Sequence, residues 1–117
     1  MEIKDLVQKS HENAVEKGFW EDWNLYDAQE INLNNISKIK CDYNNALGNR
    51  LMLIVSELAE AQDALRKGDW ENFKEELADV AIRLGDLCGG LNIDLGAEVL
   101  KKMERNKQRP YKHGKQF

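Results

Sequence analysis

The sequence predicts an all-α protein of four to five helices with an antiparallel helical hairpin at its core. Apolar residues recur at the three- and four-residue spacing of a packed helix face over residues 45–67 and 70–88. The short turn Lys67-Gly68-Asp69 separates these segments, and helices joined this closely pack antiparallel. The length of 117 residues fits one domain. A composition of 42% hydrophobic and 32% charged residues with one proline favours a folded helical chain.

Helix-capping residues mark the ends of the expected helices. Gly68 suits the left-handed position after the first arm of the hairpin, and Asp69 suits the N-cap of the second. Asp94 is expected to cap the last helix, and Pro110 lies just beyond its end. The helices expected from period and caps are residues 3–17, 45–67, 70–88 and 95–106.

The segment between the first helix and the hairpin has no clear period. Residues 18–30, GFWEDWNLYDAQE, are aromatic and indicate a loop or a short helical turn. Residues 31–47 contain isoleucines at helical spacing, but asparagines disfavour a helix interior. The sequence leaves this segment open.

Two stripes run side by side along the second arm of the hairpin. One is apolar and the other is polar, and they consist of Leu77, Val80, Leu84, Leu87 and Leu91, and of Glu76, Asp79, Arg83 and Asp86. Side chains three or four positions apart on a helix are neighbours. We therefore expect Arg83 to pair with Asp79 or Asp86 rather than to contact a ligand. On the first arm, the expected packed face is Leu47, Leu51, Ile54, Val55, Leu58, Ala61 and Leu65.

Two carboxylate pairs interrupt these apolar runs: Glu57 with Glu60, and Glu76 with Asp79. Each pair shares a helix face, and each lies about seven residues from the turn, so the four acids should meet at one level of the hairpin. Oxygen ligands suit Mg²⁺, with Mn²⁺ as a substitute. A solvated helix edge is the alternative. A zinc or di-iron site is disfavoured, because the chain has two histidines and no E-x-x-H pattern.

The pattern E-x-x-E, fifteen residues, E-x-x-D resembles the MazG-like all-α nucleoside triphosphate pyrophosphohydrolases. The stretches SELAEAQDALRKGDWENFKEELADVAIRLGDLCGGLNIDL and KKMERNKQRPYKHGK are similar to that family's central hairpin and closing helix with its tail. HENAVEKGFW is similar to the opening helix of its dCTP pyrophosphatase-like relatives. The resemblance covers residues 45–115 and about 10–20, and leaves residues 21–44 unmatched.

The resemblance implies one domain over residues 1–117, with a basic C-terminal end and tail at 103–117, that forms a homodimer or homotetramer to complete a four-helix bundle. It implies Mg²⁺ held by Glu57, Glu60, Glu76 and Asp79. It also implies hydrolysis of a (deoxy)nucleoside triphosphate to the monophosphate and pyrophosphate, in nucleotide-pool control or housecleaning. Glu57 or Glu60 would accept a proton from the attacking water.

The resemblance also implies substrate contacts away from the acids. Lys102 and Asn106 match the family's phosphate and sugar contacts, and Arg109 is a further phosphate candidate, with a solvated basic tail as the alternative. His11 and Trp20 match base-pocket residues, with core packing as the alternative. Those relatives have a further tryptophan where this chain has Lys67, so cytosine selectivity does not follow.

Charge and cysteine content bound the other functions. Residues 101–117 carry a net charge of +6 and residues 1–100 carry −10, which argues against nucleic acid as a partner. No apolar run reaches the roughly 20 residues that span a bilayer, and the N-terminus lacks an apolar signal core. Two cysteines without metal or disulfide spacing are typical of a cytoplasmic protein.

Two alternative functions remain open from the sequence. The first is a non-catalytic helical bundle in which the acids bind metal structurally and the protein acts as an interaction module. The second is a phosphoribosyl-ATP pyrophosphohydrolase, which shares the architecture, although the likeness around His11 and Trp20 disfavours it.

Overall fold

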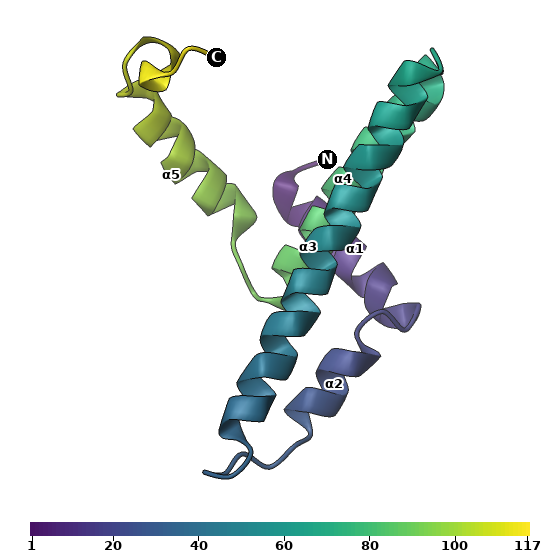
Figure 1. Ribbon diagram of the computed structural model, residues 1–117, viewed down its shortest axis with the longest axis vertical. Helices are drawn as coiled ribbons and strands as arrows, with labels where there is room; N and C mark the ends of the chain where they lie inside the picture. Colours follow the sequence, from purple (N-terminus) through teal and green to yellow (C-terminus); the bar gives the residue numbers. More distant parts are fainter.

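A computed structural model describes residues 1–117 and is all-helical, without strands (Figure 1). Its longest helices are antiparallel neighbours, as the sequence predicts, and α1 packs against the second of them. A short 3₁₀ helix follows the last α-helix. The elements are α1 (Ile3–Glu16), α2 (Glu21–Asp27), α3 (Ile36–Arg66), α4 (Trp70–Gly90), α5 (Leu95–Lys107) and η1 (Tyr111–Gly114).

The predicted turn and caps of the hairpin are confirmed. Gly68 has a φ of +73°, the left-handed conformation that a side chain disfavours. The Asp69 carboxylate accepts a hydrogen bond of 3.1 Å from the backbone N–H of Asn72. Asp94 caps α5 in the same way, accepting from the N–H of Ala97 at 3.0 Å. These contacts satisfy helix N–H groups that would otherwise lack a partner.

The segment that the sequence left open is largely helical, because its asparagines build a turn before α3. The Asn32 side chain accepts hydrogen bonds from the N–H groups of Asn34 and Asn35, at 2.8 and 3.1 Å. The Asn35 side chain accepts in return from the N–H of Asn32 at 2.8 Å. Residues of this kind disfavour helix interiors but favour helix starts. As a result α3 extends over 31 residues, and its N-terminal part packs against α2.

Small residues let α1 approach α4 closely. Gly89 and Gly90 face His11 and Trp20, and a Cβ atom at these glycines would lie 2.5 Å from His11 Cβ and 2.1 Å from Trp20 Cη2. Ala14 of α1 is also buried. The absence of side chains at the end of α4 therefore fixes where α1 and the following turn dock.

Replacing Gly90 by alanine is expected to destabilise the fold by about 1–3 kcal/mol, because the methyl group would overlap the Trp20 ring. Gly48→Ala is the matched control, since a Cβ atom there meets nothing within 4 Å on the exposed side of α3. That control should stabilise the protein by about 0.5–1 kcal/mol through helix propensity. Thermal or urea unfolding of both variants measures the difference. A Gly90→Ala protein as stable as the wild type would contradict this packing.

The expected apolar face of α3 is only half covered by the rest of the chain. Leu51, Val55, Leu58 and Leu65 each expose between 48 and 52% of their surface, so the expectation that they are buried is wrong for a single chain. The buried positions of α3 are mostly small residues and Glu57 instead. Figure 1 shows α5 leading away from the α3–α4 hairpin. The radius of gyration is 17.7 Å, against about 13 Å for a compact domain of this length.

No helix of this structure combines the length and the apolar character that crossing a membrane requires.

Candidate metal centre and active site

The two hairpin arms bring the predicted acids together. Glu57 comes from α3 and is 9% exposed, and Glu76 comes from α4 and is also 9% exposed. One carboxylate oxygen from each of Glu57, Glu76 and Asp79 lies within 4.8 Å of the other two. Glu60, the fourth predicted acid, is exposed and lies outside this group of three, although its proximity contributes to the shifted pKa of Glu76.

Glu76 is the acid with the most unfavourable surroundings. Burial, and then hydrogen bonding with Glu60 and Glu57, raises the pKa of Glu76 to about 7. Its Oε2 atom is buried and has no hydrogen-bond partner. A buried carboxylate oxygen without a partner is rare and destabilising. The possible ligand atoms of this cluster are carboxylate oxygens of Glu57, Glu76 and Asp79, which a hard divalent cation prefers, so these residues could hold Mg²⁺.

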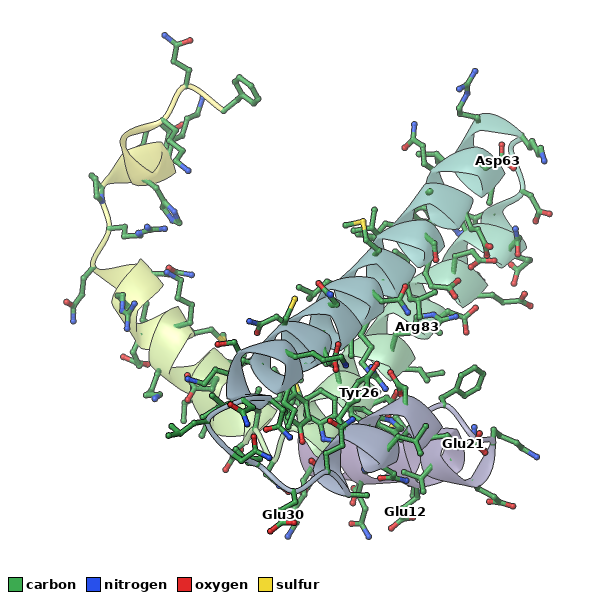
Figure 2. All side chains as sticks on the ribbon, turned by 60° about the horizontal axis from the view of Figure 1, so that its bottom comes forward. Glu12, Glu21, Tyr26, Glu30, Asp63 and Arg83 are labelled. Carbon is green, nitrogen blue, oxygen red and sulfur yellow. The ribbon has the colours of Figure 1, made fainter.

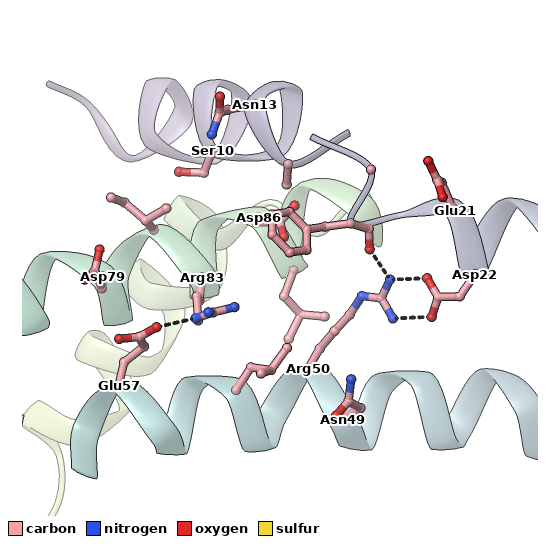
Figure 3. Close-up of a pocket in the computed structure, with 16 residues that line it drawn as sticks. Ser10, Asn13, Glu21, Asp22, Asn49, Arg50, Glu57, Asp79, Arg83 and Asp86 are labelled. Atoms are coloured by element: carbon pink, nitrogen blue, oxygen red, sulfur yellow. Dashed lines mark hydrogen bonds and ion pairs between the residues drawn. The ribbon is translucent and has the colours of Figure 1, made fainter. Parts of the chain in front are cut away.

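Arg83 neutralises Glu57, which differs from the pairing that the sequence suggested. Its Nε donates a hydrogen bond of 2.7 Å to Oε1 of Glu57, across the hairpin (Figure 3). This bond from Arg83 lowers the pKa of Glu57. The expectation of a pair with Asp79 or Asp86 is wrong, because the Arg83 side chain reaches across to α3 instead of running along α4.

Asp86 binds the two predicted base-pocket residues instead. His11 Nδ1 lies 3.0 Å from Asp86 Oδ1, and Trp20 Nε1 donates to the same oxygen at 2.8 Å. The Arg50 guanidinium lies 4.1 Å from the centre of the Trp20 ring, and Trp20 is 3% exposed. These contacts agree with the core-packing interpretation of Trp20. A role for His11 and Trp20 in binding a base stays a prediction.

Arg50 is a site residue that the sequence analysis missed. Two of its nitrogens donate to the two carboxylate oxygens of Asp22, at 2.8 and 3.2 Å, and a third bond of 3.0 Å reaches the carbonyl of Phe19 (Figure 3). The bond from Arg50 lowers the pKa of Asp22. This bidentate pair fastens α2 to α3. The sequence feature that could have identified Arg50 is its position directly before the apolar run LMLIV.

A cavity of about 580 Å³ adjoins the acid cluster, a volume typical of small-molecule sites. It lies between α1, the start of α2 and the two hairpin arms (Figure 3). The cavity is lined by two acids of the cluster, Glu57 and Asp79, and by Arg50 and Arg83. The polar side chains on its wall are Ser10, Asn13, Glu21, Asp22, Asn49, Arg50, Glu57, Asp79, Arg83 and Asp86.

The predicted residues of the C-terminal part do not reach this cavity in the same chain. Lys102 and Asn106 lie on α5, and Arg109 follows it. Figures 1 and 2 show α5 and the C-terminal residues leading away from the hairpin, and Figure 2 shows Arg83 on the side of the hairpin away from α5. Arg109 Nη1 donates to His113 Nδ1 at 2.9 Å, and Asn106 Oδ1 is buried without a hydrogen-bond partner.

Comparisons with protein-family models, with curated proteins and with solved structures found no match.

Proposed function

We propose that this protein is a Mg²⁺-dependent nucleoside triphosphate pyrophosphohydrolase of the MazG-like all-α type. The observation that carries the proposal is the acid cluster: oxygens of Glu57, Glu76 and Asp79 lie within 4.8 Å of one another, and the buried Oε2 of Glu76 has no partner. The adjoining cavity of about 580 Å³ offers space for a nucleoside. The E-x-x-E and E-x-x-D pattern supports the choice of a triphosphate as substrate.

The clustered acids would hold the metal, with Glu60 beside them. Bound Mg²⁺ would neutralise charge on the triphosphate oxygens and make a water molecule more acidic. Glu57 belongs to the group of three that would hold the metal, whereas Glu60 is exposed and lies outside that group. We therefore assign to Glu60 the role of accepting the proton of the attacking water. The cavity wall would orient the nucleoside and limit its access to bulk water.

A second copy of the chain would complete the site. The half-exposed apolar residues of α3, Leu51, Val55, Leu58 and Leu65, form a face that a second hairpin could cover. Two hairpins packed in this way would form a four-helix bundle. The divergent α5 would then reach the neighbouring chain, where Lys102, Asn106 and Arg109 could contact the phosphates and the sugar. An interface of this kind would also explain the small core of the single chain, in which 12 of 117 residues are buried.

The direct test is a substrate panel. The purified protein is incubated with Mg²⁺ and each common ribo- and deoxynucleoside triphosphate, and pyrophosphate and monophosphate are measured. We expect equal amounts of the two products for at least one deoxynucleotide. Release of inorganic phosphate in place of pyrophosphate would contradict the reaction. No turnover with Mg²⁺ or Mn²⁺ on any substrate would favour the non-catalytic metal-binding bundle.

Mg²⁺ affinity is expected to rise with pH and to level off above neutrality. The raised pKa of Glu76, about 7, means that a proton competes with the metal for this carboxylate below that pH. Each pH unit below 7 should weaken binding by about tenfold if one proton is displaced. Calorimetric titrations of Mg²⁺ without nucleotide at pH 6, 7 and 8 measure this. A pH-independent affinity would show that Glu76 is not a ligand.

A further inference from the structure

One acid of the cluster, Glu57, already forms an ion pair with the side chain of Arg83. Glu57 Oε1 accepts from Arg83 Nε at 2.7 Å, and the side chains of the two residues are 12% and 37% exposed. The pair joins α3 to α4 at the level of the cluster. Glu76 and Asp79 have no comparable ion pair. The guanidinium therefore lies at the edge of the site where Mg²⁺ is proposed to bind.

A guanidinium and a divalent cation cannot share this position freely. Both carry positive charge, and their repulsion grows in a half-buried site where the effective dielectric is lower than in water. The single carboxylate group of Glu57 would have to serve both the guanidinium, through Oε1, and the metal. A metal bound through Glu57 therefore competes with Arg83 for the charge of this carboxylate and weakens the Arg83 bond.

We infer that Arg83 is a displaceable counter-ion of the metal site: it holds Glu57 in the metal-free protein and leaves Glu57 when Mg²⁺ binds. This inference rests on the proposed metal site and adds a second state to it. Arg83 would stabilise the metal-free hairpin and at the same time weaken metal affinity. The site would then be loaded only when the metal is abundant or arrives with a ligand that compensates for the lost ion pair.

The released guanidinium of Arg83 would lie in the cavity. Arg83 lines this cavity together with Asp86, which lies three residues further along the same face of α4. The other arginine of the cavity, Arg50, is held by Asp22 and by the carbonyls of Phe19 and Ala46, so it cannot replace Arg83 at Glu57 without breaking those bonds. Metal binding would thus place a free cation on the cavity wall beside the acid cluster.

The test is the Mg²⁺ affinity of Arg83→Gln, measured by calorimetry on the whole protein without nucleotide. We expect binding about three- to tenfold tighter than in the wild type, because no ion pair has to break. The matched control is Arg66→Gln, which removes the same charge from an exposed position nine residues beyond Glu57 on α3. Its affinity should stay within about twofold of the wild type.

Thermal unfolding gives the second readout. The metal-free Arg83→Gln protein should melt at a lower temperature than the wild type, and the rise in melting temperature on adding Mg²⁺ should be larger. Arg83→Lys keeps the positive charge but forms a less well-oriented hydrogen bond with Glu57. Its Mg²⁺ affinity should lie between those of the wild type and Arg83→Gln. This variant keeps the test informative if the glutamine variant does not fold.

The outcomes separate this inference from the proposed function. Unchanged or weaker Mg²⁺ binding by Arg83→Gln, with clear binding by the wild type, would overturn the displacement and leave the metal site standing. A wild-type protein that binds no Mg²⁺ at all would overturn both.

Discussion

Glu76→Gln is expected to abolish pyrophosphate release while making the metal-free protein more stable at pH 8. The amide keeps the size of the side chain but removes a charged metal ligand. Loss of a residue that only supports a ligand costs 10–100-fold in metal affinity or activity, so loss of a ligand itself should cost at least about a hundredfold. The reaction is followed by pyrophosphate release at saturating Mg²⁺, and stability by thermal unfolding without metal.

The expected gain in stability follows from the sign of the pKa shift. The folded-state pKa of Glu76, about 7, lies above its ordinary value of 4.5. The folded state therefore binds the proton more tightly than the unfolded state. The stability that this tighter proton binding by Glu76 contributes is fully present below pH 4.5 and is lost as the pH rises through 7. At pH 8 the charged carboxylate destabilises the metal-free fold, and glutamine removes that charge.

Glu75→Gln is the matched control for this variant. Glu75 precedes Glu76 on α4 and is exposed, so its replacement should change neither activity nor melting temperature appreciably. If Glu76→Gln kept wild-type activity, the acid cluster would not be the catalytic metal site. If it lost activity and also melted lower at pH 8, the burial of a charged Glu76 would not be the source of strain.

Mixing two inactive variants is expected to restore activity if α5 of one chain serves the acid cluster of the other. Glu76→Gln removes one metal-binding acid of the cluster, and Lys102→Ala removes the proposed phosphate contact. In a 1:1 mixture of dimers that exchange chains, half of the dimers are mixed and each has one intact site of two. About a quarter of the wild-type activity should return. Sedimentation equilibrium of the wild type measures whether the chain forms the required dimer or tetramer.

A second pair of variants controls for the mixing experiment. Glu76→Gln and Asp79→Asn both remove acids that one hairpin supplies, since both residues lie on α4. No mixed dimer of these two variants contains an intact acid cluster, so no activity should return. If the Glu76→Gln and Lys102→Ala mixture stayed inactive while chain exchange was demonstrated by mass, Lys102 would act in its own chain or not at all.

The hairpin was predictable because its signals are local. The apolar period, the glycine of the turn and the Asp69 cap all act within a few residues, and the equal distance of the two acid pairs from the turn places them at one level. The start of α3 was not predictable from helix propensity. The same asparagines that weaken a helix interior form the turn that begins it, and only the geometry at Asn32 and Asn35 distinguishes the two.

Partners across helices were not predictable from spacing. Arg83 pairs with Glu57, which lies 26 residues away on another helix, and not with the acids of its own helix. Asp86 joins His11 and Trp20 over 75 and 66 residues. The leucine stripe of α3 shows the same limit, because a period identifies an apolar face but not the surface that covers it.

The orphaned Oε2 of Glu76 has a consequence for the redesign of this protein. A computational or laboratory search that scores only the folding free energy of the metal-free chain would favour an uncharged or apolar residue at position 76, because that change relieves an unpartnered buried oxygen. The most stabilised sequences for this backbone would therefore be those that had lost the proposed chemistry. Selection for thermal resistance should be carried out with Mg²⁺ present, so that the carboxylate contributes to fitness instead of being selected against.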